Sequence, residues 1–155
     1  MCGIAGIVAL DGSPISGLAE RLAVMADRIA HRGPDGEGRW MDPTGIAGIV
    51  HRRLAIIDLS ATGAQPMEGA DGCQLVHNGE IYNYPELREE LAERWPFRSR
   101  SDTETILAAH DAWQDDAPRH FRGMWAYALW NPARRRLFAS RDRFGIKPFY
   151  YARIG

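Results

Sequence analysis

Met124–Trp130 is a run of seven apolar residues that constrains the fold more than any other segment. Side chains alternate between the two faces of a strand, so a strand that is apolar at every position has to be covered on both faces. The run is much shorter than the ~20 residues that a membrane-spanning helix needs. It therefore predicts a strand held between two layers, with Trp125, Tyr127 and Trp130 in the core and no association with a membrane.

Other segments carry strand or helix signals. Apolar residues recur at helical spacing between Leu18 and Ile29, before Gly33-Pro34, and two more helices are expected to begin at Pro85 and near Asp102. Strands at both ends of the chain, with helices grouped between them, indicate an α+β fold of antiparallel sheets covered by helices. The remaining strands are expected at residues 3–10, 46–50, 54–59, 74–77, 80–82, 136–140 and 149–154.

Charge and residue counts exclude several classes of function. The 19 basic and 20 acidic side chains leave a formal net charge of −1, so no basic excess points to nucleic acid as a partner. Two cysteines are too few for the disulfide scaffold of a secreted domain, and we expect a cytoplasmic protein. The five histidines show no metal-ligand spacing, so no metal site is expected. No P-loop or dinucleotide-binding glycine motif is present.

Cys2 is the strongest candidate for a catalytic nucleophile in this sequence. If Met1 is removed, the thiol and the α-amine of Cys2 share one carbon atom, and the amine can take the thiol proton because the reference pKa values of the two groups are close. A small buried cysteine at the start of a strand is the structural alternative, and for Cys2 taken alone we favour it.

Asn78-Gly79 has two interpretations. Asn-Gly between two strand-like segments is the strongest short signal for a hairpin turn, and this is the default. Alternatively, the Asn78 amide and the Gly79 backbone N–H form an oxyanion hole, since glycine lets a developing negative charge approach closely.

The run His51-Arg52-Arg53-Leu54 and the residue Asp102 are weaker candidates. An arginine beside a buried strand can bind a carboxylate with two parallel hydrogen bonds, although surface arginines are commoner. Asp102 could receive a substrate ammonium, but helix capping by Ser101 or Asp102 explains that position equally well.

Six motifs occur in order along the whole chain. They are Met1–Gly6, His31–Asp35, His51–Asp58, Asn78–Asn83, Ser101–Glu104 and Arg141–Gly145. Together they closely resemble class II glutamine amidotransferases, and most of all the glutaminase domain of glutamine-dependent asparagine synthetases. The resemblance implies an N-terminal nucleophile hydrolase fold over residues 1–155, a four-layer αββα sandwich of two antiparallel sheets with helices outside.

The resemblance also implies a role for each motif. Cys2 would attack the side-chain amide of glutamine and form a thioester, releasing ammonia and then glutamate. Asn78 and Gly79 would hold the oxyanion, and Arg53 would bind the substrate α-carboxylate. Glu80 and Asp102 would lie near the α-ammonium, and backbone groups of the strand formed by Leu54, Ala55, Ile56 and Ile57 would complete the pocket.

Members of the synthetase branch continue into a large ATP-dependent domain that consumes the ammonia. We therefore expect a C-terminally truncated glutaminase domain whose partner in the full-length protein is that synthetase domain. ATP and magnesium would belong to the synthetase domain, and no cofactor is expected in this chain. A homodimer stays open, as do two other functions: an N-terminal nucleophile hydrolase acting on another amide, and a catalytically silent regulatory or interaction domain.

Overall fold

Two antiparallel sheets form the centre of the computed structural model, which describes residues 1–154 apart from the side chain of Asp71. The first sheet has the order β1-β3-β2, and the second has the order β4-β5-β6-β7. The strands of the first sheet are β1 (Gly3–Val8), β2 (Gly36–Met41) and β3 (Ala47–Arg53). Those of the second are β4 (Met67–Glu68), β5 (Gln74–Ile81), β6 (Gly123–Asn131) and β7 (Arg136–Arg141).

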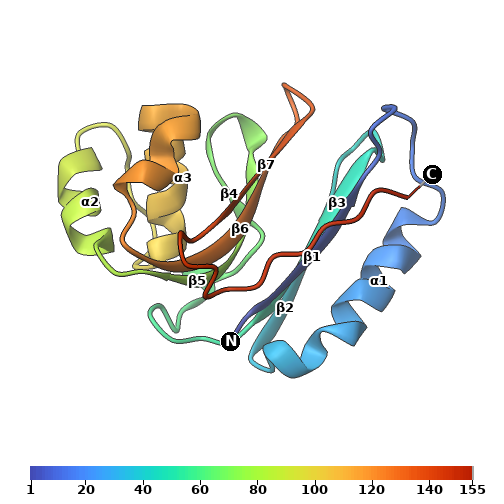
Figure 1. Ribbon diagram of the computed structural model, residues 1–155, viewed down its shortest axis with the longest axis horizontal. Helices are drawn as coiled ribbons and strands as arrows, with labels where there is room; N and C mark the ends of the chain where they lie inside the picture. Colours follow the sequence, from blue (N-terminus) through green and yellow to red (C-terminus); the bar gives the residue numbers. More distant parts are fainter. Residues whose placement is uncertain (155) are drawn as a thin grey trace.

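Helices cover the outer faces of both sheets (Figure 1). Helix α1 (Leu18–Arg28) lies on the first sheet, whereas α2 (Tyr84–Leu91) and α3 (Asp102–Trp113) lie on the second. Four 3₁₀ segments connect these elements: η1 (Ala30–Arg32), η2 (Ala61–Gly63), η3 (Ala70–Gly72) and η4 (Gln114–His120). The arrangement confirms the predicted α+β sandwich of two antiparallel sheets with helices outside.

The predicted double-sided burial of β6 is confirmed. Trp125 and Tyr127 pack in the cluster that contains the helix residues of α2 and α3. Ala128 and Trp130 point the other way, where Ala128 packs with Ile49 of β3. Burial on this scale supplies most of the stability of the sandwich, since each large apolar side chain removed from water contributes about 1.5–3 kcal/mol.

Two of the strand predictions are wrong. Residues 54–59 form a loop, and the apolar Ile56 in it is 68% exposed. Residues 149–154 form no strand either, and Tyr150 and Tyr151 are exposed by 90% and 93%. Short apolar segments gave the strand signal in both cases, but neither segment meets a partner strand among the described residues.

Strand β2 was missed, because its sequence begins with Gly36 and Gly38 and glycine usually marks a turn. Gly38 is needed there, since a Cβ built on it would lie 1.9 Å from the backbone oxygen of Gln65. None of the helices in residues 1–154 is long and apolar enough to cross a membrane.

Candidate active site

Strands β3 and β5 lie against each other across the sandwich, and they bring distant parts of the sequence to one edge. Ile49 packs with Val76, and His51 Nε2 lies 3.2 Å from the backbone oxygen of His77. Two residues further along each strand come Arg53 and Gly79. The ends of β3 and β5 therefore meet at the same edge of the sandwich.

Cys2 lies at this edge, directly before β1. Its Sγ accepts the Leu54 N–H at 3.4 Å and lies 3.6 Å from the Leu54 carbonyl oxygen. Arg32 donates from Nε to the Cys2 carbonyl oxygen at 3.4 Å. The half-buried thiol thus sits at the point where the chain leaves β3 after Arg53.

Asn78-Gly79 is part of a continuous strand, so the hairpin interpretation is wrong. Gly79 allows β6 to approach closely, because a Cβ built on it would lie 2.1 Å from the Met124 oxygen. The side chain of Asn78 is 4% exposed and shares a strand face with Val76, which packs against the first sheet. The Asn78 amide therefore points between the sheets.

Backbone donors of β5 line the edge of the strand that faces away from β6. His77 donates its N–H to Gln65 Oε1 at 2.6 Å, and Ile81 donates to Asp102 Oδ2 at 2.9 Å. Backbone groups alternate in direction along an antiparallel strand, so the Gly79 N–H points to the same edge, between these two. Asn78 and Gly79 can thus present a side-chain donor and a backbone donor within one residue of each other.

The guanidinium of Arg53 is held in place by the loop after β3. Its Nη1 donates to the Ser60 oxygen at 2.9 Å, and Nη2 donates to the Asp58 oxygen. Asp58 organises this loop, because its carboxylate accepts the backbone N–H of Ser60 and of Arg100, each at 2.9 Å. The Ser60 hydroxyl also donates to this carboxylate, and its hydrogen bond has the largest effect on the pKa of Asp58. Together these hydrogen bonds lower that pKa to about 2.

The segment 54–57 approaches Cys2 as a loop rather than as the expected strand. Leu54 contacts the thiol, and Ala55 donates its N–H to Asp35 Oδ2 at 2.9 Å. Ile57 is half-buried, and Ile56 points to solvent. The backbone of Leu54 and Ala55 therefore lies at the Cys2 edge, whereas the side chain of Ile56 does not.

Asp102 is buried at the first turn of α3, and its carboxylate accepts the Ile81 N–H described above. The helix is capped by Ser101, whose hydroxyl accepts the Thr103 N–H at 3.1 Å. Glu80 lies one residue before Ile81 and shares a strand face with Asn78. Both predicted acidic residues are thus neighbours of Asn78-Gly79.

Two buried histidines lie near this edge, and sequence reasoning assigned them no role. The His51 ring reaches the second sheet at the His77 oxygen, and the His77 ring contacts the Thr103 hydroxyl of α3 at 3.2 Å. Burial lowers the pKa of His51 to about 4 and also lowers that of His77. Both are therefore neutral near pH 7. Sequence reasoning also missed Asp58, although Asp58, Ser60 and Thr62 follow the spacing of a side-chain-to-backbone turn, which was an available signal.

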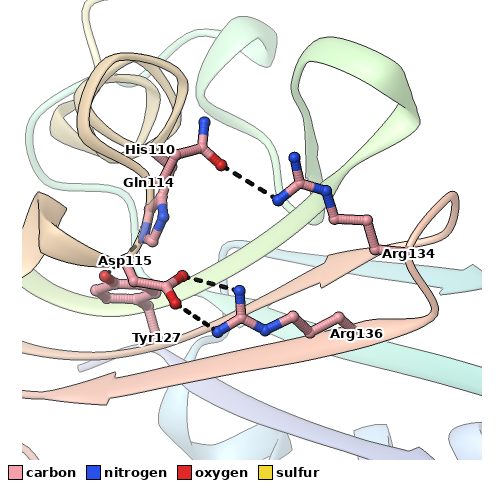
Figure 2. A network of polar contacts seen from close by, with 6 residues as sticks. All are labelled: His110, Gln114, Asp115, Tyr127, Arg134 and Arg136. Atoms are coloured by element: carbon pink, nitrogen blue, oxygen red, sulfur yellow. Dashed lines mark hydrogen bonds and ion pairs between the residues drawn. The ribbon is translucent and has the colours of Figure 1, made fainter.

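A second group of polar side chains lines a cavity of about 100 Å³ on the opposite face of the second sheet, beneath the end of α3. Figure 2 shows Gln114 and Asp115 facing Arg134, in the turn between β6 and β7, and Arg136, at the start of β7, with His110 beside them. We call the cavity and the polar side chains around it the α3 cavity; these side chains are His110, Gln114, Asp115, Tyr127, Arg134 and Arg136. It contains none of the predicted site residues. Among the described residues, no cluster of three or more His, Cys, Asp or Glu side chains could hold a metal ion.

Comparison with known proteins gives consistent matches. The family model of the glutamine amidotransferase domain matches residues 1–155. Asparagine synthetase [glutamine-hydrolyzing] 1 of Bacillus subtilis is 41% identical over 99% of this chain and 24% of its own length. Amidase chry2 of Gibberella zeae is 39% identical over 97% of this chain and 24% of its own length. The chain thus spans about a quarter of the length of these relatives.

A solved structure supports the fold. The glutamine phosphoribosylpyrophosphate amidotransferase of B. subtilis superposes with a TM-score of 0.74 over 96% of this chain and 38% of its own. Its sequence is 17% identical, so this likeness concerns the fold alone. The match of the family model over the whole chain, together with relatives at about 40% identity, shows that the chain belongs to the glutamine amidotransferase domain family.

Proposed function

We propose that this domain hydrolyses the side-chain amide of glutamine to glutamate and ammonia, with Cys2 as the nucleophile. The observation that carries the proposal is the meeting of three kinds of group at one edge of the sandwich. They are the Cys2 thiol, the oriented Arg53 guanidinium and the donors of Asn78-Gly79. We call these four residues the Cys2 edge.

Removal of Met1 gives Cys2 a free α-amine, which acts as its base. The amine takes the proton from Sγ, and the sulfur forms a bond to the amide carbon of glutamine. The carbonyl oxygen becomes negative and accepts hydrogen bonds from the Asn78 amide and the Gly79 N–H. When the C–N bond breaks, ammonia leaves with the proton held by the α-ammonium. Water, deprotonated by the same amine, then cleaves the thioester, and the thiol regains its proton.

Recognition of an amino acid follows from the charged groups around the thiol. The Arg53 fork is fixed by the Ser60 and Asp58 carbonyl oxygens, and we assign it to the substrate α-carboxylate. Glu80 and Asp102 supply negative charge beside Gly79 for the α-ammonium. Backbone groups of Leu54 and Ala55 complete the pocket on the side of the thiol.

The ammonia would be passed to a second domain. The asparagine synthetases that this chain matches are about four times its length, so we assign the domain to the ammonia-supplying part of such a synthetase. ATP and magnesium would act in that second domain. The isolated residues 1–155 should then release ammonia without forming asparagine or consuming ATP.

Hydrolysis of another amide is the second candidate, because two of the similar proteins are named amidases. The two candidates differ in their need for an α-carboxylate. A glutaminase should lose most of its activity toward a glutamine whose α-carboxylate is replaced by an amide, since Arg53 then has no anion to bind. An amidase of broad specificity should cleave both compounds at similar rates.

The test is glutamate release by folded protein that begins at Cys2. We expect release by this protein and by Cys73→Ala, which removes the other cysteine, and none by Cys2→Ala. Circular dichroism and gel filtration establish that each variant is folded. A folded, correctly processed chain that releases no glutamate would instead support the silent regulatory domain.

A further inference from the structure

Lys147 is the only lysine among the 19 basic residues of the chain. Lysine is normally exposed, but this side chain is only 5% exposed. Its Nζ lies 3.0 Å from Sδ of Met1, the residue that precedes the proposed nucleophile. The one compact, strongly hydrated cation of this chain is thus placed in the interior, beside the N-terminus.

The loop that carries Lys147 is fixed by the buried carboxylate of Asp142. Oδ2 of Asp142 accepts the Lys147 N–H at 2.9 Å and the Trp125 N–H at 3.2 Å, while Oδ1 accepts the Ile146 N–H at 2.9 Å. Arg141 closes the loop by donating from Nε to the Lys147 oxygen at 2.7 Å. The backbone position of Lys147 is therefore set by Asp142 and Arg141, and Met1 takes no part in these bonds.

The ammonium of Lys147 has no anionic partner among the described residues, since none of their four ion pairs includes it. A buried ion without a counter-ion is costly to keep. Two titratable groups lie close to it: the buried His77, on which the charge of Lys147 acts, and Asp142, whose carboxylate is occupied by backbone N–H groups of Trp125, Ile146 and Lys147. A cation held in this way is useful where a negative charge appears during a reaction.

We infer that Lys147 is a positioning residue for the nucleophile: after Met1 is removed, its ammonium faces the Cys2 thiol and stabilises the negative charge on the sulfur. The inference rests on the proposed function. The proton of the thiol still passes to the α-amine, and no bond to Lys147 forms or breaks. The contact with Met1 Sδ places the ammonium beside the residue that directly precedes Cys2.

Alkylation of Cys2 with two reagents of different charge tests the inference. A cation beside the thiol should favour the anionic iodoacetate over the neutral iodoacetamide, and a purely structural lysine would not change this ratio. We expect Lys147→Met to lower the ratio of the two rate constants about tenfold, the lower end of the effect of a focused positive potential. Lys147→Arg should keep most of the ratio. Arg134→Met, which removes a distant positive charge, should not change it.

The rate constants are followed by mass spectrometry of the N-terminal peptide, so that Cys73 does not contribute. An unchanged ratio in folded Lys147→Met would overturn the inference. An increase in KM for glutamine without a change in the ratio would also overturn it, because Lys147 would then bind the substrate carboxylate. If the unaltered chain is alkylated with the expected ratio but releases no glutamate, the proposed function fails and the assignment of Lys147 stands.

A second measurement needs no variant, and it decides the matter if Lys147→Met does not fold. Labelling with ¹³C-lysine gives one set of side-chain signals, because the chain has one lysine. Carboxymethylation of Cys2 places a carboxylate on its sulfur, and the chemical shift of the Lys147 ε-carbon should then change. Carbamidomethylation of Cys2 adds no charge and should change this chemical shift less. Equal shifts with both reagents would contradict the inference.

Discussion

The Cys2 edge and the α3 cavity both gather polar side chains, but these side chains are held differently in the two regions. In the α3 cavity the side chains bind one another (Figure 2): His110 contacts the Tyr127 hydroxyl at 2.8 Å, and Arg136 makes two hydrogen bonds to Asp115. At the Cys2 edge they are held by the backbone, as Arg53 is by the Ser60 and Asp58 oxygens.

This difference separates a structural network from a reactive site. Polar groups that are paired with each other have little capacity left for a ligand, even where a cavity lies beside them. Groups that are oriented by backbone oxygens keep the rest of their hydrogen-bonding capacity for a substrate. We therefore expect changes at the Cys2 edge to alter turnover, and changes at the α3 cavity to alter stability alone.

The largest effect should come from Asn78→Ala. Loss of one oxyanion donor should lower kcat for glutamine hydrolysis about 10²- to 10³-fold, with little change in KM. Steady-state kinetics on folded protein measure this. A normal kcat per folded molecule, with a loss of stability only, would place Asn78 with the structural network and remove the distinction between the two regions.

Acid should weaken both regions through their buried histidines. The pKa values of His51 and His110 are lowered to about 4, mainly by burial, so the unfolded chain binds protons first as the pH falls. Stability should therefore be lost between about pH 6.5 and pH 4, by on the order of 3 kcal/mol for each histidine. Denaturant unfolding at pH 7 and pH 5 checks this, and His110→Gln should reduce the pH dependence without changing kcat. Equal stabilities at the two pH values would contradict the burial of these groups.

Arg53→Lys should raise KM for glutamine about tenfold, because lysine keeps the charge but loses the planar fork that matches a carboxylate. The neighbouring Arg52, which pairs with Glu37 instead, provides the matched control. Arg52→Lys should leave KM near its original value. If only the control raises KM, the carboxylate site belongs to Arg52.

The smallest effect should come from Asp115→Asn in the α3 cavity. Asp115 and Arg136 are about half exposed, so their ion pair should contribute less than about 1 kcal/mol. Thermal unfolding should shift by a few degrees at most, and glutamate release should be unchanged. A loss of activity in this variant would show that the α3 cavity takes part in the reaction.

Much of the fold could be predicted from residue patterns. The apolar run of β6 predicted its burial on both faces, and the spacing of apolar residues predicted the buried faces of α1 and α2. The spacing in α3 indicated one apolar face, whereas residues 102–110 of this helix are all buried. The pattern failed where long-range contacts decide. Gly38 and Gly79 are typical of turns, yet both lie in strands, because a neighbouring segment packs where a side chain would be. No local signal contains that information.

Much of the fold could be predicted from residue patterns, whereas the site could be predicted only from the resemblance to a family. Residue patterns alone indicated Cys2, the Arg52-Arg53 pair and Asn78 as separate weak candidates. Only the family resemblance of the ordered motifs combined Cys2, Arg53 and Asn78 into one predicted site. The structure brings them to one edge through the contacts between β3 and β5. Lys147 could not be found in this way, because its significance lies in burial and in its distance from residue 1.

The central claim is that Cys2 with a free α-amine attacks glutamine, and trapping the covalent intermediate tests it most directly. Protein beginning at Cys2 is mixed with glutamine and quenched in acid, and its peptides are weighed by mass spectrometry. We predict a γ-glutamyl group on the peptide that contains residue 2, and none when Met1 is retained. Full turnover by a chain that retains Met1, or an adduct on Cys73 instead, would contradict the account.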